Sequence, residues 1–241
     1  GLFRLLLAPV RYALRLDPPD ERIDPWTMSE NRFNVVVTAC LRLRGLDEND
    51  EGGTFCISNY HMPCAFYAPP VMNIHAEMVV RHCEKLAGSD PHILAGDFNF
   101  MPDSPHYKLI TTGELWRNDP SYPKKKWGME WRSNIRGMRS AYAESNHGEP
   151  DFTNYAQVED DEPFIGTLDY VFLSDEWDVV GVRSTPHRRS VRDGPYPNEN
   201  EPSDHIVIAA DLTLPSGGRR DATGGEGASA TGRSGDGGFF S

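Results

Sequence analysis

The sequence predicts a mixed α/β domain that combines a β-hairpin with a helix connecting two strands. Two β-branched stretches, 34–43 and 54–59, flank an acidic, glycine-containing turn and are typical of an antiparallel strand pair. Residues 71–86 carry apolar side chains at helical spacing without glycine or proline, so they predict a helix. The short apolar stretch 92–95 predicts the next strand. This order of elements favours an α+β fold or an α/β sandwich.

The rest of the domain predicts a second helix, a long loop and further strands. Ser104 is a helix-capping residue followed by proline, which predicts a short helix over 104–111. Residues 118–136 are polar, contain three consecutive lysines and predict a loop. Apolar stretches of strand length lie at 168–173, 177–182 and 206–212.

Composition limits the extent of the domain and the classes of function. We leave residues 1–33 poorly assigned, place the domain at 34–214 and expect the glycine-rich segment 215–241 to be disordered. The net charge of −12 argues against a general nucleic-acid coat protein, which needs a basic surface. It is compatible with a metal-dependent nuclease, because bound cations invert the local charge of a carboxylate site.

The cysteines show no zinc-ligand spacing and lie in apolar surroundings; they are Cys40, Cys56, Cys64 and Cys83. They are therefore interpreted as reduced thiols of an intracellular protein. No apolar stretch reaches the length of about 18 residues that spans a membrane. Together these features favour a cytoplasmic protein without a membrane partner.

Polar clusters lie at the ends of the predicted strands and together predict a site for phosphate-ester hydrolysis. In chain order they are Asn59 with His61, Asp97 with Asn99, Asp169, and Asp204 with His205. Taken alone, each cluster is better explained as a turn, a cap or an exposed histidine. As a set, they supply oxygen and nitrogen ligands for Mg²⁺, a carboxylate to orient water and imidazoles to stabilise a charged phosphorus centre.

Longer motifs around these clusters carry a family resemblance. They are GDFNFMPDSPHYKLITTG, MRSAYAESNHGEPDFTNY followed by FIGTLDYVFLS, and EPSDHIVIAADL. In this order they resemble the signature of the DNase I-like endonuclease/exonuclease/phosphatase superfamily. The similarity is strongest to the branch of the carbon-catabolite-repression deadenylases, nocturnin, the Angel proteins and the 2′,5′-phosphodiesterases.

The resemblance implies a DNase I-like two-sheet α/β sandwich and a Mg²⁺-dependent phosphodiesterase, with Mn²⁺ as the alternative ion. The implied reaction is hydrolysis of RNA from its 3′ end, as in poly(A) removal. The implied partners are RNA with a 3′ poly(A) end or a small adenine nucleotide.

The resemblance also implies roles for individual residues at the metal. Asp97 polarises or deprotonates the attacking water, and Asn99 binds the transition-state phosphate. His205 ligates the metal or stabilises the phosphate, with Asp204 holding it. The implied metal ligands are Asp97, Asn99 and His205.

The remaining implied roles concern orientation and substrate binding. Asp169 orients a neighbouring catalytic histidine or its water, and His61 donates a hydrogen bond to the scissile phosphate. Phe164 falls where the deadenylases stack an adenine, and Asn59 and Asn154 are the other expected substrate contacts. A core phenylalanine is the alternative interpretation of Phe164.

The sequence departs from the family at its N-terminal end. Family members begin with a strand carrying a catalytic Asn, and a later strand carries a metal-binding Glu within Leu-Gln-Glu. Glu21 and Glu30 lie in polar, proline-flanked stretches and are interpreted as solvated charges. We therefore expect the domain to be incomplete at its N-terminus. Two alternatives stay open: a phosphatase or phosphodiesterase acting on a small adenine nucleotide, and a catalytically inactive binding module.

Overall fold

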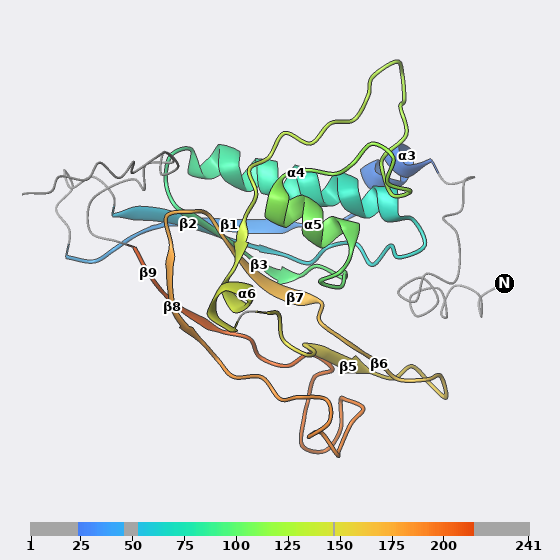
Figure 1. The fold of residues 1–241 in the computed structure, drawn as a ribbon, viewed down its shortest axis with the longest axis vertical. Coiled ribbons are helices and arrows are strands. Elements are labelled where there is room, and N and C mark those ends of the chain that lie inside the picture. Colours follow the sequence, from blue (N-terminus) through green and yellow to red (C-terminus); the bar gives the residue numbers. More distant parts are fainter. Residues whose placement is uncertain (1–23, 46–52, 147, 215–241) are drawn as a thin grey trace, which may run out of the picture.

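The computed structural model describes residues 24–45, 53–146 and 148–214, which form a helical layer, a central sheet and a smaller second sheet (Figure 1). The helices are α3 (Pro25–Glu30), α4 (Pro69–Ala87), α5 (Pro105–Thr112) and α6 (Ala141–Asn146). The strands are β1 (Val36–Arg42), β2 (Thr54–Tyr60), β3 (His92–Asp97), β4 (Arg139–Ser140), β5 (Asn154–Ala156), β6 (Phe164–Gly166), β7 (Asp169–Leu173), β8 (Asp178–Val182) and β9 (Ala210–Thr213).

The central sheet has the strand order β1-β2-β3-β7-β4. β1 and β2 form an antiparallel pair, β2 and β3 run parallel, and β3 and β7 are antiparallel. The parallel step requires a long connection, and α4 supplies it between β2 and β3. The carboxyl ends of β2 and β3 therefore lie beside the start of β7, at the same end of the strands.

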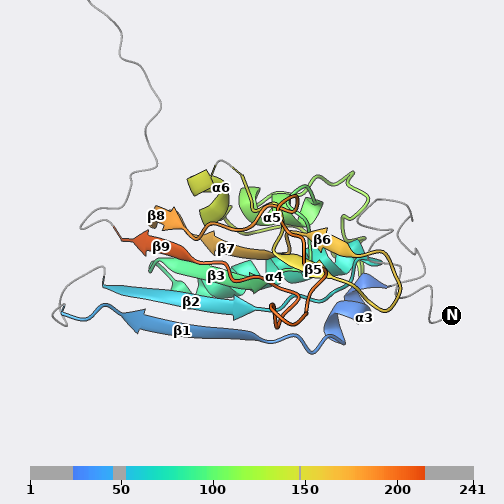
Figure 2. The same ribbon diagram turned by 90° about the horizontal axis from the view of Figure 1, so that it is seen from below.

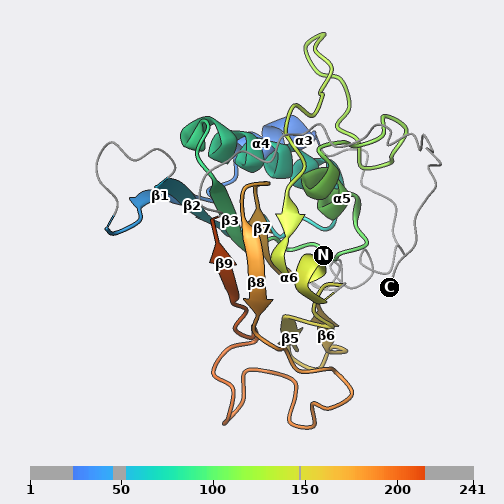
Figure 3. The same ribbon diagram turned by 60° about the vertical axis from the view of Figure 1, so that its left-hand side comes forward.

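Each face of the central sheet is covered by a different layer (Figure 3). Helices α3, α4 and α5 cover one face, where Leu94 and Phe172 are fully buried. The β8–β9 sheet packs on the opposite face through a second cluster that contains Ile93, Leu173 and Trp177. The chain thus buries both faces of β3 and β7, which is why these two strands are largely apolar.

β1 forms an edge of the central sheet, away from β8 and β9 (Figure 2). Apolar side chains alternate along this edge and the residues next to it, and they are exposed: Phe33, Val35, Val37, Leu41 and Leu43. Because side chains alternate along a strand, Val37 and Leu41 share the face on which Phe55 of β2 contacts the second cluster.

The predicted strands and helices are confirmed, with differences at their ends and among short elements. α4 begins at Pro69, two residues earlier than predicted, with proline in its first turn, where no intrahelical N–H bond is lost. β9 begins only at Ala210, because the N–H of Ile206 first bonds to the carbonyl of Thr153. α3, α6, β4, β5 and β6 were not predicted, since elements of two to six residues carry little periodicity.

The prediction of four reduced cysteines is wrong for one pair. Cys40 and Cys56 form a disulfide across β1 and β2, whereas Cys64 and Cys83 are free. The two bonded residues face each other in the antiparallel register, with their Cα atoms 4.1 Å apart. This pairing follows from strand register, which the spacing of the cysteines in the sequence does not fix.

Two expectations concern segments outside the described residues. The solvated charge of Glu21 and the disorder of 215–241 therefore stay predictions. Glu30, the last residue of α3, is exposed as expected for a solvated charge. Among the helices that the structure describes, none combines the length and the apolar character needed to cross a bilayer.

A buried polar network links the two main helices. The Nδ1 atom of His106, on α5, lies 2.7 Å from Oδ1 of Asn73, on α4. Because Nδ2 of Asn73 donates to the backbone carbonyl and the hydroxyl of Ser121, its Oδ1 is the acceptor and His106 Nδ1 carries the proton. Burial lowers the pKa of His106 from 6.5 to about 4.

This shift predicts an acid-sensitive contribution to stability. Between pH 6.5 and about 4 the unfolded chain binds a proton at His106 that the folded chain does not, so the unfolding free energy falls as the pH falls. The contribution from this residue amounts to about 3 kcal/mol at most. His106→Gln removes the titrating group, so its destabilisation relative to the wild type should shrink on acidification. Urea denaturation of the wild type and the variant at about pH 7 and about pH 4.5 measures this destabilisation. If the destabilisation is the same at both pH values, the lowered pKa of His106 is contradicted.

Candidate active site

Two carboxylates lie side by side where β3 ends and β7 begins. Asp97 is the last residue of β3, and the antiparallel register places it opposite Asp169, the first residue of β7. Residues directly opposite each other in a sheet share a face, so both side chains project on the side that carries the second sheet. The N–H of Phe98 bonds to the carbonyl of Leu168 at 2.8 Å and continues the pairing beyond the strands.

The glycine before Asp97 allows the chain that follows β2 to pass close to it. Gly96 has φ +142°, and a Cβ atom there would lie 2.0 Å from the carbonyl oxygen of Tyr60. The N–H of Met62 then donates to the carbonyl of Asp97 at 2.8 Å. This close approach brings His61 beside Asp97, as the sequence motifs predicted.

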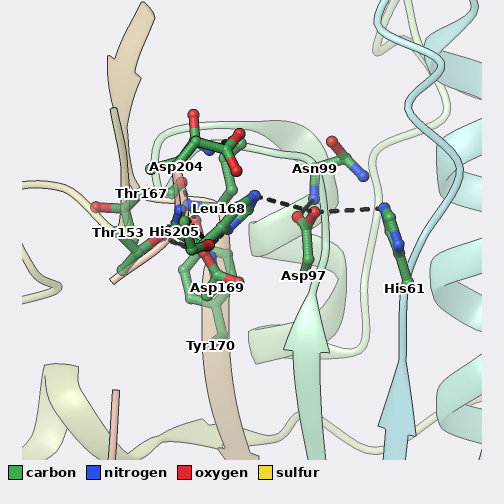
Figure 4. A network of polar contacts seen from close by, with 12 residues as sticks. His61, Asp97, Asn99, Thr153, Thr167, Leu168, Asp169, Tyr170, Asp204 and His205 are labelled. Carbon is green, nitrogen blue, oxygen red and sulfur yellow. Dashed lines mark hydrogen bonds and ion pairs between the residues drawn. The ribbon is translucent and has the colours of Figure 1, made fainter. Parts of the chain in front are cut away.

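Asp97 lies between two imidazoles (Figure 4). Its Oδ2 atom is 3.4 Å from Nε2 of His61 and 3.8 Å from Nε2 of His205. His61 is largely exposed, whereas Asp97 is mostly covered, with 17% of its side chain accessible. Solvent therefore reaches the Asp97–His61 pair from the side of His61.

His205 is held by Asp169 on the far side of the ring. Its Nδ1 atom lies 2.8 Å from Oδ2 of Asp169, which leaves Nε2 directed toward Asp97. The same Oδ2 accepts a 2.6 Å hydrogen bond from the hydroxyl of Thr153. Thr153 is fully buried, and its oxygen also accepts from the N–H groups of Leu168 and Asp169. The hydroxyl thus fixes the carboxylate that orients the imidazole.

The electrostatics of the cluster follow from burial and from the two neighbouring carboxylates. Burial raises the pKa of Asp97, and the charge of Asp169 raises it further. The N–H of Asn99 and the two imidazoles oppose this rise. The hydrogen bond to Asp169 raises the pKa of His205 to about 8, against the effect of its burial. His205 is thus largely an imidazolium near neutral pH.

Asn99 turns the chain beneath Asp97. It adopts a left-handed conformation with φ +53°, which asparagine tolerates better than most residues. Its N–H donates to Oδ1 of Asp97 at 2.9 Å, and its side-chain amide donates to the carbonyl of Met62 at 2.9 Å. Asn99 therefore holds Asp97 in place and, being buried, offers little besides its amide oxygen to a ligand.

Asp204 has a different contact from the one expected. The structure gives the bond to the His205 ring to Asp169, whereas the carboxylate of Asp204 accepts a 3.1 Å bond from the amide of Asn154. Asn154 is buried and forms an isolated antiparallel β-bridge with His205. The contacts of Asn154 with Asp204 and His205 connect the segment before β9 to β5. Asn154 therefore has a structural role in the site.

Two residues expected to contact the substrate lie on β2 and β6. Asn59 is exposed on β2 opposite Ala95, which places it on the same sheet face as Asp97, one residue pair before the strand ends. Phe164 is half-buried on β6 opposite Ala156. Thr153, by contrast, was not assigned a role from the sequence, although it lies in the quoted motif DFTNY.

The described residues alone do not fit a Mg²⁺ centre. Within the described ranges, no group of three or more His, Cys, Asp or Glu side chains is placed to hold a metal ion. Oδ2 of Asp169 is already bonded to Thr153 and His205, and Mg²⁺ requires six ligands in near-octahedral geometry. The predicted metal-ligand roles of Asp97, Asn99 and His205 stay predictions.

The arrangement is suited to acid–base work on an ester of phosphate. A half-buried carboxylate with a raised pKa can take a proton from water, and an imidazolium held by a second carboxylate can donate to a phosphoryl oxygen. Such a set is compatible with hydrolytic chemistry.

The chain belongs to the endonuclease/exonuclease/phosphatase family, whose model matches residues 10–205. It is similar to the CCR4-Not complex 3′-5′-exoribonuclease subunit Ccr4 of Phaeosphaeria nodorum, with 38% identity over 130 residues, 52% of this chain and 21% of that protein. Nocturnin of Drosophila melanogaster is 28% identical over 209 residues, 85% of this chain and 31% of nocturnin. The chain thus spans between about a fifth and a third of the length of these curated relatives.

Solved structures agree with the predicted fold. ANGEL2, described as a 2′,3′-cyclic phosphatase in complex with adenosine-2′,3′-vanadate, aligns with a TM-score of 0.58 at 20% identity. The alignment covers 81% of this chain and 64% of ANGEL2. The fold is therefore the DNase I-like α/β sandwich.

Removing the hydroxyl of Thr153 tests the support of Asp169. Thr153→Val keeps the shape of the side chain but leaves the buried N–H groups of Leu168 and Asp169 without their acceptor. We expect a loss of about 1–3 kcal/mol in unfolding free energy. Thr153→Ser retains the hydroxyl and serves as the matched control, with a smaller loss. Chemical denaturation measures both, and equal stabilities of the two variants would contradict this role.

Proposed function

We propose that this chain is the hydrolytic domain of a phosphodiesterase that shortens RNA from its 3′ end, in the manner of a poly(A) deadenylase. The observation that supports the proposal most directly is the placement of Asp97 between His61 and His205. The match to a 3′-5′-exoribonuclease subunit over 52% of the chain favours RNA as the substrate.

Each residue of the site has its own proposed role in hydrolysis. Asp97 accepts the proton of the attacking water, since its Oδ2 is the carboxylate oxygen that faces both imidazoles. His205, held at Nδ1 by Asp169, donates from Nε2 to a phosphoryl oxygen. His61 contacts the phosphate from the solvent side. Thr153 keeps Asp169 and therefore His205 in orientation.

A requirement for Mg²⁺, with Mn²⁺ as the alternative, is part of the proposal. It is supported by the family membership and by the carboxylate and amide oxygens of Asp97 and Asn99. Mg²⁺ is commonly held by one or two carboxylates together with water and substrate phosphates. Since the described residues do not complete such a centre, the metal requirement is tested separately from the roles above.

Hydrolysis of a small adenine nucleotide is the second candidate. Nocturnin matches 85% of this chain, and 2′,5′-phosphodiesterase 12 of Mus musculus matches 68% at 28% identity. Both matches extend over more of the chain than that to the exoribonuclease subunit. The half-buried Phe164 on β6 is the residue we propose for stacking an adenine in either substrate.

Replacing the central carboxylate tests the proposed function. Asp97→Asn keeps the size of the side chain and the bond from Asn99 but removes the base, so AMP release from a 5′-labelled oligo(A) should fall about 10²- to 10⁴-fold. Asp211→Asn, an exposed residue of β9, is the matched control and should retain activity. Assays with Mg²⁺, with Mn²⁺ and with EDTA measure the metal requirement.

The same assay separates the alternatives. Release of phosphate from adenine nucleotides without shortening of oligo(A) would favour the second candidate. A wild-type chain that hydrolyses neither substrate with either ion would contradict the proposed activity and favour a binding module.

A further inference from the structure

A basic, aromatic loop projects from the helical layer beside α3 (Figure 1). This segment, 116–132, is called the tryptophan loop below. It contains five basic and two acidic residues, whereas the whole chain has a net charge of −12. The catalytic cluster does not use these residues. The loop thus concentrates positive charge on an otherwise acidic protein.

The base of the tryptophan loop is anchored on the helices. Trp131 is buried and meets Tyr122 edge-on, with ring centroids 5.0 Å apart. The indole N–H of Trp26, on α3, donates to the carbonyl of Lys124 at 2.8 Å. Asn73, on α4, donates to Ser121 at the start of the turn. The loop is therefore positioned by buried contacts at both of its ends.

The tip of the loop holds an aromatic residue in an unfavourable conformation. Lys126 and Met129 exchange both backbone hydrogen bonds around a two-residue turn, Trp127-Gly128, in which both residues have positive φ. Asn, Asp and Gly suit such a turn, and a bulky side chain at positive φ costs free energy. Trp127 is nevertheless 67% exposed, so burial does not compensate for this cost. Strain of this kind at an exposed position is typical of binding sites.

Each exposed indole of the loop carries a lysine ammonium on its face. Nζ of Lys126 lies 4.2 Å from the centre of the Trp127 ring, and Nζ of Lys108, on α5, lies 4.2 Å from that of Trp116. Trp116 is 64% exposed. An arginine neighbour of Trp116, Arg117, pairs with Glu130 at 3.2 Å and joins the two parts of the loop. Flat aromatic faces beside cations match the bases and phosphates of a nucleic-acid strand.

We propose that the tryptophan loop binds single-stranded RNA, with bases stacking on Trp127 and Trp116 and phosphates contacting the ammonium groups of Lys108 and Lys125. Lys126 is bonded to Asp24, and Arg117 and Arg132 are paired with Glu130, so these three cations hold the loop in place. This surface goes beyond the hydrolytic site and rests on the proposed function only for the choice of RNA. An acidic peptide would engage the lysines but would not use the exposed indoles as stacking surfaces, so the aromatic pairs favour a nucleic acid. Stacking tolerates any base, and the loop should therefore bind without strong sequence preference.

Binding of fluorescently labelled oligo(A) and oligo(U), measured by anisotropy in EDTA, tests the proposal without hydrolysis. Trp127→Ala should weaken both affinities between about 5- and 100-fold. Trp127→Phe retains an aromatic face and should recover part of the loss. Phe33→Ala removes an even more exposed aromatic residue outside the loop and should leave affinity unchanged. Lys125→Gln should reduce the slope of log affinity against log salt by about 0.7.

The outcomes that would overturn the proposal are distinct from those that concern hydrolysis. Equal RNA affinities of the wild type and Trp127→Ala would show that no base stacks on the tip. A wild-type chain that binds poly-glutamate but neither oligonucleotide would show an acidic partner instead. Hydrolysis of bis(p-nitrophenyl) phosphate reports on the catalytic cluster alone, and Trp127→Ala should leave any such activity unchanged while Asp97→Asn removes it.

Discussion

The antiparallel register of β3 and β7 places the carboxylates of Asp97 and Asp169 opposite each other in a half-buried setting. Two like charges at this position repel, and burial adds to the cost of ionising Asp97. His205 lies between them, with Nδ1 on Asp169 and Nε2 toward Asp97. An imidazolium there compensates both carboxylates. Thr153 and Asp169 hold this histidine, and the side of Asp97 next to the exposed His61 stays open to solvent.

Two residues, Gly96 and Thr153, complete the arrangement that the register begins. The absence of a side chain at Gly96 lets the carbonyl of Tyr60 approach, which carries the chain of β2 across the end of β3 and sets His61 against Asp97. Thr153 takes part in three hydrogen bonds that connect β5 to the start of β7. Both features are ordinary in composition and acquire their role only from the fold.

The sequence predicted α4 and the strands β1, β2, β3 and β7 of the central sheet because their apolar patterns are uninterrupted, whereas β4, with two residues, carries no pattern. It also predicted that His61, Asp97, Asn99, Asp169, Asp204 and His205 would lie together, since each cluster stands at the end or the start of a predicted strand. It assigned the hold on the His205 ring to Asp204, whereas the structure gives this contact to Asp169, because the contact depends on how the segment before β9 crosses β5. The same limit applies to the Cys40–Cys56 bond, which depends on strand register.

Under the two proposals, the site and the tryptophan loop would carry out two tasks in two parts of the domain. The site offers a buried carboxylate with two imidazoles, which suits chemistry on one phosphate, whereas the loop offers exposed indoles and cations, which suit an extended strand. The two parts lie on opposite sides of the central sheet, since the loop is anchored on the helical layer and the site faces the second sheet. A longer RNA could contact both only by passing around the sheet edge.

We propose that His61 and His205 flank the position where a phosphate binds next to Asp97. Titration with AMP, followed through the imidazole Nε2 resonances in ¹⁵N NMR, tests this placement. The signals of His61 and His205 should shift together and saturate at one dissociation constant. The exposed His82 and the buried His106 should not move. Shifts at His82 with none at His61 or His205 would show that the phosphate binds elsewhere.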